Sequence, residues 1–270
     1  MPELPEVQTV VDDLITAGVV GRIFQQIGVY WPKSIATHSV RRFRSALAGA
    51  RIETISRRGK FIVIEVGGRG WLLVHLRMSG HIHLVRSQAP RAKHEHVVFR
   101  LDDGSEMRFH DPRKFGRLYW VGDPAEIVGH LGPEPLGKRF TGKLLATMLA
   151  NRRRQLKPLL LDQSFLAGLG NIYVDEALWA SALHPETPSN RVGEAAARRL
   201  HRAIRRVLRR GLGNGGTSLS GGEGNFSSVN GRAGRNRDYL AVFRRTGQPC
   251  PRCRTPIERT TVGQRGTHFC

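Results

Sequence analysis

Met1-Pro2-Glu3-Leu4-Pro5-Glu6-Val7 opens the chain, and the rest of the sequence is best understood outward from this stretch. Proline followed by acidic residues is typical of a helix start, because proline is tolerated in the first turn and carboxylates favour the positive end of the helix dipole. Val7, Val10, Val11 and Leu14 follow at helical spacing. On these residues alone, the simplest interpretation is an ordinary amphipathic helix.

The same stretch contains an unusual nucleophile if the initiator methionine is removed, which the small Pro2 side chain favours. An N-terminal amine titrates at about pH 8, so a fraction is uncharged at neutral pH and can attack an aldehyde-like carbon to form a Schiff base. A secondary amine gives an iminium ion, which is already cationic and acts as an electron sink. Glu3 and Glu6 lie beside it as candidate proton donors and acceptors.

The charge balance of the chain predicts a polyanionic partner. Its 270 residues include 43 lysines and arginines against 22 acidic residues, for a formal charge of +21 and an isoelectric point near 11.3. Nucleic acid is the expected partner, with binding that weakens steeply with salt, and the alternative is a protein that is merely basic or ribosome-associated. No apolar run approaches the ~20 residues of a membrane span and there is no signal-peptide pattern, so we expect a soluble cytoplasmic protein.

Strand patterns dominate the first half of the chain. β-Branched and aromatic residues gather in several runs, and Asp103-Gly104 marks a hairpin turn. Residues 1–130 are therefore predicted to form a β-sandwich with the N-terminal helix laid against it. The runs cover residues 22–31, 52–66, 71–85, 97–108 and 118–121.

Several polar residues of this half have both a structural and a functional interpretation. Lys60 follows Gly59 at a point where the backbone can approach a ligand closely, although an exposed edge-strand lysine is the common alternative. Two histidine pairs, each two residues apart, would share one face of a strand, as metal ligands in β-barrels do. No local carboxylate completes either pair, so roles beside phosphate fit the basic context better. The pairs are His81 with His83 and His94 with His96.

Helical patterns replace the strands after a glycine- and proline-rich linker at residues 128–140. Thr141 is a candidate cap for a helix that runs through Met148. Further along, Gly168-Leu169-Gly170-Asn171-Ile172-Tyr173 predicts a tight turn with Asn171 as the cap of the next helix, and the N–H groups of such a turn can bind an anion. Helix, glycine turn and helix is a common DNA-backbone clamp, but also an ordinary helix–helix joint.

A long helix is predicted over residues 194–210, with aliphatic residues from Leu200 to Leu208 on its buried face. Arginines dominate its other faces, as a solvated basic surface or as one that faces phosphate. Residues 211–236 are rich in Gly, Ser and Asn, which predicts a mobile loop of the kind that forms lids.

The three cysteines, Cys250, Cys253 and Cys270, lie within the last 21 residues, which favours a local metal site over a disulfide scaffold. A Cys-x2-Cys knuckle followed by another cysteine forms part of a zinc ribbon, but a structural zinc normally has four ligands. The missing ligand has three explanations: a sequence truncated after Cys270, a non-cysteine ligand such as His268, or compromised zinc binding. We expect one structural zinc and favour truncation.

Several separate motifs, in the same order and across nearly the whole chain, resemble the formamidopyrimidine-DNA glycosylases, the bacterial base-excision repair enzymes for oxidised purines. Chance agreement of all of them is remote. They are Pro2-Glu3-Leu4-Pro5-Glu6-Val7, Arg58-Gly59-Lys60, His75-Leu76-Arg77-Met78-Ser79-Gly80, Lys93-His94-Glu95-His96, Asp111-Pro112-Arg113-Lys114-Phe115-Gly116, Gly168-Leu169-Gly170-Asn171-Ile172-Tyr173, and the cysteine unit with Gly263-Gln264-Arg265-Gly266-Thr267-His268-Phe269-Cys270.

The resemblance implies a role for each matching residue. Pro2 would attack C1′ of the damaged nucleotide, Glu3 would move protons at the sugar and base, and Lys60 would contact phosphate near the lesion and assist proton transfer. Arg265 would bind the flanking phosphate and assist the second strand cleavage, and Asn171 would hold a phosphate at the helix–turn–helix. The other DNA-contacting residues would be His94, Arg113, Arg152 and Lys157, and the gap left by the extruded base would be filled by Met78, Arg113 and Phe115.

The implied fold class is α+β, in three parts. An N-terminal helix and β-sandwich would occupy residues 1–130, and a helix-two-turn-helix DNA-binding domain residues 131–238, with a lesion-capping loop at 211–236. A zinc-ribbon-like β-hairpin would occupy residues 239–270. The implied partner is double-stranded DNA with a damaged base, and we expect a monomer associated with the bacterial nucleoid in the cytoplasm.

The implied activity is that of a bifunctional DNA glycosylase and AP lyase. Pro2 displaces the base, the iminium acidifies the C2′ proton, and β- then δ-elimination cut the strand on both sides. Zinc would be structural, and the chemistry needs no redox cofactor or catalytic metal.

Three departures from the family pattern, including the missing fourth cysteine described above, leave other interpretations open. The segment Thr217-Ser218-Leu219-Ser220-Gly221-Gly222 is hard to align, and Phe243-Arg244-Arg245 stands where the family more often has tyrosine followed by glycine. The second interpretation is an endonuclease VIII-like glycosylase for oxidised pyrimidines, although Leu4 and the long loop favour the purine enzyme. The third is a non-catalytic DNA-binding protein, which the intact catalytic residues disfavour.

Overall fold

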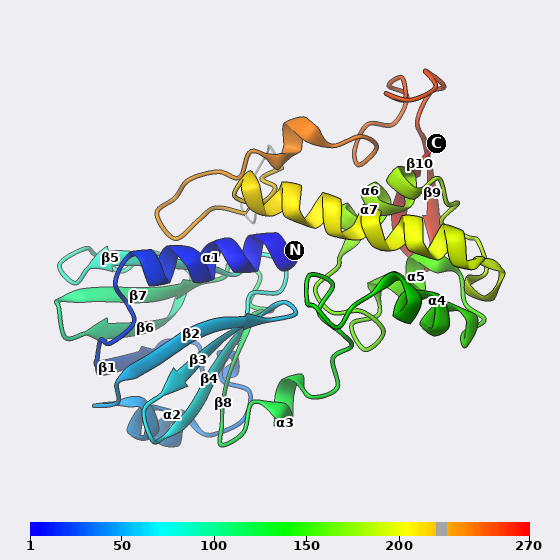
Figure 1. Ribbon diagram of the computed structural model, residues 1–270. Helices are drawn as coiled ribbons and strands as arrows, with labels where there is room; N and C mark the ends of the chain where they lie inside the picture. Colours follow the sequence, from blue (N-terminus) through cyan, green and yellow to red (C-terminus); the bar gives the residue numbers. More distant parts are fainter. Residues whose placement is uncertain (220–225) are drawn as a thin grey trace. The chain divides into compact units, whose positions relative to one another are not determined.

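The computed structural model describes residues 1–219 and 226–270 of the chain (Figure 1). These residues divide into two compact units. The first unit contains Met1–His130 together with Asn214–Arg235, and the second contains Leu131–Gly213 together with Asn236–Cys270. The three-part division by domain stays a prediction.

The first unit consists of two four-stranded antiparallel sheets and helix α1 (Figure 1). One sheet has the order β1-β6-β7-β5 and the other the order β2-β3-β4-β8. The helices are α1 (Leu4–Thr16), α2 (Val40–Leu47) and α3 (Ala125–Val128), with the 3-10 turn η1 (Pro32–Ser34). The strands are β1 (Phe24–Val29), β2 (Ile52–Arg58), β3 (Phe61–Val66), β4 (Gly70–His75), β5 (His81–Arg86), β6 (Glu95–Leu101), β7 (Ser105–His110) and β8 (Arg117–Val121).

Helix α1 forms where the apolar spacing predicts it, and it packs against β2 and β3. Its stripe from Val7 to Leu14 is fully buried, in one hydrophobic core with the inward-facing residues of both sheets. The predicted hairpin turn at Asp103-Gly104 is confirmed, since it joins β6 to β7 and Asp103 Oδ1 accepts the backbone N–H of Ser105 at 2.9 Å. Burial of alternate apolar residues from two sheets is the dominant stabilisation of this unit.

The segment from Asn214 to Arg235 belongs to the first unit, far along the chain from the rest of it. The Asp13 carboxylate on α1 accepts the backbone N–H of Val229 and pairs with Arg232, both at 3.1 Å. Phe226 and Val229 are buried in the core. These described flanks are held by specific contacts, unlike the free loop expected from composition, and residues 220–225 at the centre of the expected lid lie outside the described residues.

The second unit is helical and ends in a two-stranded hairpin (Figure 1). The long helix α7 packs against α4 and α6, and β10 packs against α6. Its elements are α4 (Gly142–Ala150), α5 (Leu156–Leu161), α6 (Asn171–Ser181), η2 (Ser189–Arg191), α7 (Glu194–Gly213), η3 (Asn236–Tyr239), β9 (Glu258–Val262) and β10 (Arg265–Phe269).

Two helix starts in this unit test the predicted caps. Thr141 caps α4 as expected, because its hydroxyl oxygen accepts the backbone N–H of Leu144 at 3.1 Å. The prediction that Asn171 caps α6 was wrong. Gly170 is the N-cap, and Asn171 is the first helical residue. Its side chain instead donates to the carbonyl of Gly266 on the hairpin, at 2.9 Å. No helix in the two described ranges combines the length and apolar character that crossing a membrane requires.

Candidate active site and DNA-binding residues

The N-terminal stretch is both a helix start and a buried polar site. Glu3 is the N-cap of α1, and its backbone N–H donates to Glu6 Oε2 at 2.8 Å in a reciprocal capping box. The other Glu6 oxygen accepts the backbone N–H of Thr217 at 2.7 Å. Pro2 and both glutamates are buried. The acids that begin the helix are therefore buried and hydrogen-bonded at the end of the helix that follows Pro2.

Electrostatics place the candidate catalytic groups of the first unit together. Burial lowers the pKa of the N-terminal amino group at Met1, Glu3 and Glu6 oppose that shift, and the positive charges of Lys60 and Arg113 reinforce it. Burial disfavours the ammonium form, so the site favours an uncharged amine. The charges of Glu3, Lys60 and Arg113 therefore all act on the N-terminus, which directly precedes Pro2.

Lys60 lies in a two-residue turn between β2 and β3 and is 5% exposed. It is therefore not the exposed edge-strand lysine that the sequence left as the common alternative. Gly59 permits this turn with a φ of +57°. The carbonyl of Gly59 accepts from Arg57 at 3.0 Å, and Arg57 also donates to Gln8 on α1 at 2.9 Å. The turn that presents Lys60 is thereby tied to the helix that begins at the proposed nucleophile.

His75 is a neighbour of Lys60 that the sequence analysis did not single out. Burial, the charge of Arg77 and the charge of Lys60 lower the pKa of His75 to about 3. Its Nδ1 accepts the backbone N–H of Arg77 at 3.0 Å, and its ring packs edge-on against Phe61. A neutral imidazole here adds no charge that would compete with Lys60 for an anion.

Asp111 organises the three side chains expected to fill the DNA gap. Its fully buried carboxylate accepts the Ser79 hydroxyl at 2.5 Å, and the backbone N–H groups of Arg113 at 3.3 Å and Gly116 at 2.7 Å. These bonds join the Met78 turn to the loop that follows β7. The exposed side chains that result are Met78, Arg113 and Phe115, with the Arg113 guanidinium over the Phe115 ring at 5.0 Å.

His94 lies in the loop before β6 with a φ of 71°, a conformation that non-glycine residues rarely adopt. Its carbonyl accepts the backbone N–H of Asp111 at 3.0 Å, so it belongs to the same loop system. The neighbouring His96 donates from Nε2 to the Asp111 carbonyl at 2.9 Å. In the described part of the chain, neither histidine pair converges into a metal-binding group.

In the second unit, Lys157 is completely buried. Its ammonium pairs with Asp175 Oδ1 at 2.5 Å and donates to the carbonyl of Gly266 at 2.9 Å. The second Asp175 oxygen accepts the backbone N–H of His268 at 2.9 Å. Helices α5 and α6 therefore hold β10 through a buried ion pair, beside the hydrogen bond that the Asn171 side chain donates to Gly266.

Arg265 and Arg152 are exposed, so their guanidinium groups are accessible to a phosphate. Arg265 begins β10 directly after the Gly263-Gln264 turn, in which both residues have positive φ. Such a tight turn fits a two-residue hairpin loop. Arg152 lies between α4 and α5, where its carbonyl accepts the hydroxyl of the buried Ser189 at 2.6 Å.

The three cysteines meet at one point of the second unit. Their sulfur atoms all lie within 4.8 Å of one another, which suits ligands at about 2.3 Å from a tetrahedral zinc. Burial raises the pKa of Cys250, but hydrogen bonds from the backbone N–H groups of Cys253 and Arg252 and from the Trp179 indole lower it overall to about 6. His268 Nδ1 lies 3.2 Å from Asp175 and outside the sulfur cluster.

Comparison with known proteins agrees with these features over the whole chain. A family model of the formamidopyrimidine-DNA glycosylase N-terminal domain matches residues 1–118, one of the H2TH domain of the same enzymes matches 131–221, and one of the zinc finger found in FPG and IleRS matches 247–270. Formamidopyrimidine-DNA glycosylases of Protochlamydia amoebophila and Herpetosiphon aurantiacus are each 45% identical, over 100% of this chain and 98% of theirs. The chain belongs to the formamidopyrimidine-DNA glycosylase family.

Solved structures of the formamidopyrimidine-DNA glycosylase family share this fold. A Lactococcus lactis FPG mutant in complex with DNA containing Fapy-dG superposes with a TM-score of 0.92 at 36% identity, over 100% of this chain and 98% of the other. A complex of the Lactococcus lactis Fpg with DNA containing an abasic site gives 0.91 at 35% identity, over 99% and 97%. The predicted fold class, with its N-terminal helix, paired sheets, helix-two-turn-helix domain and zinc-finger hairpin, is confirmed.

Sequence reasoning missed three buried acids that hold distant backbone segments in place, two of them beside candidate site residues. Asp111 is the first residue of a motif from which only Arg113 and Phe115 were given roles. Asp175 lies on α6, shortly after the glycine turn. Glu176 is a third such acid, since it accepts the backbone N–H groups of Ala241, Val242 and Phe243 at 2.8 to 3.0 Å. The available signal was an acidic residue inside an otherwise apolar helix or strand end.

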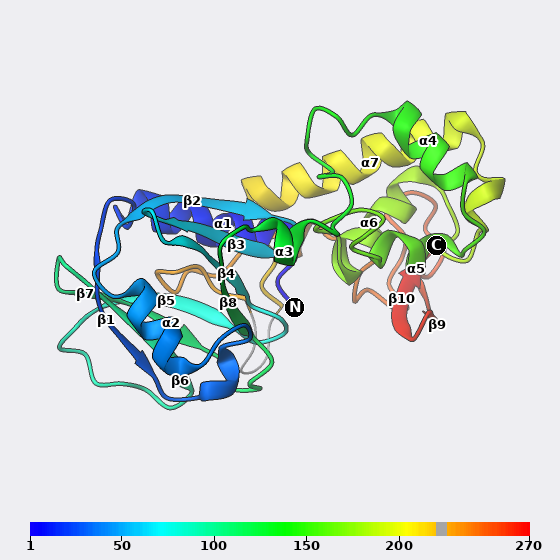
Figure 2. The same ribbon diagram turned by 90° about the horizontal axis from the view of Figure 1, so that it is seen from below.

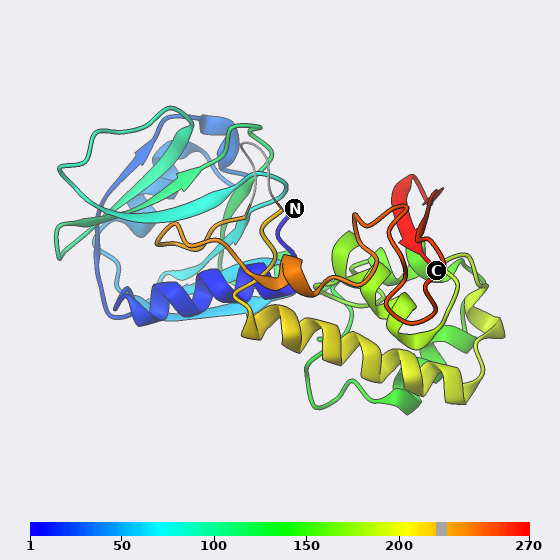
Figure 3. The ribbon, with the colours of Figure 1, turned by 90° about the horizontal axis from the view of Figure 1, so that it is seen from above.

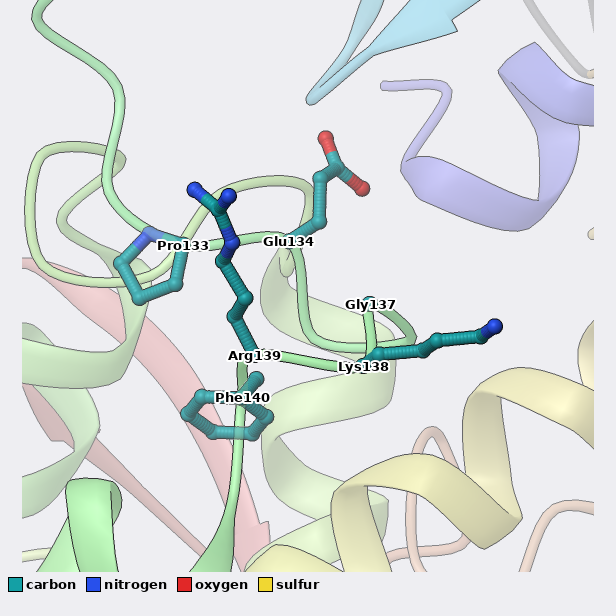
Figure 4. Close-up of a pocket in the computed structure, with 6 residues that line it drawn as sticks. All are labelled: Pro133, Glu134, Gly137, Lys138, Arg139 and Phe140. Atoms are coloured by element: carbon teal, nitrogen blue, oxygen red, sulfur yellow. The ribbon is translucent and has the colours of Figure 1, made fainter.

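One hollow of the second unit contains none of the expected site residues. Figure 4 shows this hollow, of about 410 Å³, with Glu134 and Arg139 extending in a similar direction while Lys138 points elsewhere. The hollow is lined by the linker segment and not by the segments that carry Asn171 and Arg265. The lining residues are Pro133, Glu134, Gly137, Lys138, Arg139 and Phe140.

Proposed function

We propose that this chain excises oxidised purines such as Fapy-dG from duplex DNA in base excision repair, as a bifunctional DNA glycosylase and AP lyase. Full-length similarity to formamidopyrimidine-DNA glycosylases supports this activity. The single observation that carries the residue assignment is the buried start of α1, where Pro2 and Glu3 are buried and Lys60, itself buried, lies close enough to lower the pKa of the N-terminal amine. We also propose that it acts as a monomer in the bacterial cytoplasm, where its DNA substrate lies.

The proposed reaction begins when removal of Met1 frees the secondary amine of Pro2. The Pro2 nitrogen forms a bond to C1′ as the glycosidic C–N bond breaks, and the departing base takes a proton from Glu3. Ring opening leaves an iminium ion, which makes the C2′ proton acidic. Loss of that proton expels the 3′ phosphate by β-elimination, and δ-elimination then expels the 5′ phosphate. The electron pair of the glycosidic bond leaves with the base. In the β-elimination the iminium takes up the electron pair of the broken C2′–H bond as an enamine, and those electrons expel the 3′ phosphate, which leaves with the electron pair of its C–O bond. Loss of the C4′ proton to the conjugated iminium expels the 5′ phosphate in the same way.

Cationic groups in both units would hold the DNA during these steps. We assign Lys60, in the turn between β2 and β3, to a phosphate near the lesion, and Arg265, which is exposed next to the hairpin turn, to the flanking phosphate. Met78, Arg113 and Phe115 would fill the space left by the extruded base, and their joint attachment to Asp111 supports this role. Further phosphate contacts are assigned to His94, Arg152 and Asn171.

For Lys157, complete burial supports a positioning role. Its ammonium is held between Asp175 and the carbonyl of Gly266, next to Arg265 on β10. We therefore assign it to fixing the hairpin, through which it would act on DNA binding.

A structural zinc on Cys250, Cys253 and Cys270 would hold the end of the same hairpin. The family's zinc-finger match and the convergence of three sulfur atoms support this site. A fourth ligand would have to come from a group other than these three cysteines. The zinc would supply rigidity and would take no part in the reaction.

Borohydride trapping on a duplex with one 8-oxoguanine opposite cytosine tests the mechanism. We expect a covalent protein–DNA band that Pro2→Gly abolishes, as does an extra residue before Pro2. Pro5→Ala is the matched control, because it removes a proline from the same stretch without touching the amine, and its band should persist. Trapping with Pro2→Gly equal to that of the unmodified chain would refute the assignment.

A lesion panel in the same assay separates the alternatives. A band only on oxidised-pyrimidine or abasic duplexes would indicate endonuclease VIII-like specificity. Pyrimidine lesions belong in the panel because a Lactococcus lactis FPG has been crystallised with DNA that contains an oxidised pyrimidine. No band on any duplex, despite tight and salt-sensitive binding, would indicate a DNA-binding protein without lyase chemistry.

A further inference from the structure

Helix α7 carries a row of arginines that the proposed reaction does not use. Arg199, Arg202, Arg206 and Arg209 are all exposed and recur at helical spacing along one face. None of the four has an ion pair with an acid in the described ranges of the chain. The acid that α7 itself carries, Glu194, is already paired with Arg198. We refer to these four residues as the α7 arginine row.

The surroundings of the α7 arginine row are also cationic. A hollow of about 390 Å³ lies on this face, lined by His201, Arg202, Arg205, Arg206 and Arg209. Desolvation and the nearby charge of Arg209 lower the pKa of Arg205, so like charges here repel one another. A surface that concentrates unpaired positive charge attracts polyanions, whereas the repulsion between its charges does not stabilise the fold.

The row faces away from the hairpin of the same unit. The opposite face of α7, with Leu200, Ile204 and Leu208, is buried against α4 and α6. Strand β10 packs on α6, so α6 lies between α7 and the hairpin that carries Arg265, as Figures 2 and 3 show from two sides. A straight duplex segment bound at Arg265 therefore cannot also lie along the row.

The spacing of the row suits a phosphate backbone. Ten residues separate its first and last arginines, which corresponds to about 15 Å of helix. One DNA strand places about four phosphates along that length of duplex axis, at about 3.4 Å each. Guanidinium groups bind phosphate by paired hydrogen bonds, which makes arginine better suited than lysine to this task.

We propose that the α7 arginine row is a second DNA-binding surface, which holds a separate duplex segment by its phosphates while a first duplex occupies the proposed active site. Such a surface reads no sequence, because it touches only the backbone. It would keep the enzyme on DNA between lesions by passing it from one segment to another. This surface extends beyond the glycosylase reaction and does not depend on which lesion is excised.

The test loads the full-length protein with a short duplex that contains a stable abasic-site analogue, and then adds a second, lesion-free fluorescent duplex. We expect the loaded protein to capture the second duplex at low salt, measured by anisotropy. Arg202→Gln with Arg206→Gln should weaken this capture and reduce the slope of log affinity against log salt by about 2, since each lost phosphate contact removes about 0.9.

The matched control is Arg41→Gln with Arg51→Gln, which removes the same charge from exposed arginines of the first unit. We expect this variant to capture the second duplex as the unmodified chain does. The proposal is overturned if the loaded protein captures no second duplex, if the α7 variant captures it normally, or if both variants weaken capture equally. Excision of a lesion from a short duplex by the unmodified chain and the α7 variant is measured in parallel. This measurement separates a failure of the proposed glycosylase function from a failure of the second DNA-binding surface.

Discussion

Replacing Lys157 by methionine should release the β9–β10 hairpin, because it leaves the Asp175 carboxylate buried without its cation. Both side chains of this pair are 0% exposed, and their separation is 2.5 Å. Removal of one partner from a buried ion pair costs about 3–5 kcal/mol, since the remaining charge stays desolvated. The carbonyl of Gly266 also loses its donor from Lys157. Methionine preserves most of the side-chain volume, so cavity formation adds little.

Hydrogen exchange of peptides that cover β9 and β10 measures this loss locally. Each 1.4 kcal/mol corresponds to about a tenfold change in an opening equilibrium, so Lys157→Met should raise exchange rates there by about a hundredfold to a few thousandfold. Arg154→Met is the matched control, because it breaks the Arg154–Asp162 pair, whose side chains are 48% and 32% exposed. Exposed pairs contribute at most about 1 kcal/mol, so this variant should change exchange by less than about tenfold.

A double-mutant cycle with Asp175→Leu separates the ion pair from its surroundings. The double variant should be more stable than the sum of the two single losses predicts, because no buried charge is left alone. It should not regain full stability, since the backbone N–H of His268 loses its acceptor on Asp175. The reasoning is refuted if Lys157→Met and Arg154→Met change hairpin exchange equally, or if the two buried substitutions are additive.

Two further predictions concern acid and metal. The pKa of His75 is lowered from its ordinary 6.5 to about 3 in the folded chain. Between these two values the unfolded chain binds more protons than the folded chain, so the free energy of unfolding falls as the pH drops. The loss is about 2 kcal/mol at pH 5. His75→Leu should flatten the acid limb of the unfolding curve, and an unchanged pH dependence would contradict the assigned burial. Removing zinc with a chelator, or changing Cys253 to Ser, should weaken binding to lesion duplexes and speed exchange in the hairpin, while strands of the first unit keep their protection. Equal loss of protection in both units would argue against a local zinc site.

Local sequence patterns were sufficient for most elements of this fold. The apolar stripe from Val7 to Leu14, the turn at Asp103-Gly104 and the cap at Thr141 each depend on residues a few positions apart. Helical and strand periodicity record which side chains face a core, so such elements can be predicted from composition and spacing. The motif order was likewise enough to identify the family and its fold class.

The sites themselves depended on residues that are distant in the sequence. Lys157 and Gly266 are 109 positions apart, and Asp13 and Val229 are 216 apart, yet each pair forms a hydrogen bond. A lysine in a basic stretch gives no local sign that it will be buried against an aspartate. The Gly- and Ser-rich composition after α7 gave no sign that its flanks would be fixed on α1. Only folding decides which buried acid meets which donor, because that pairing is set by the packing of whole elements and not by the periodicity within any one of them.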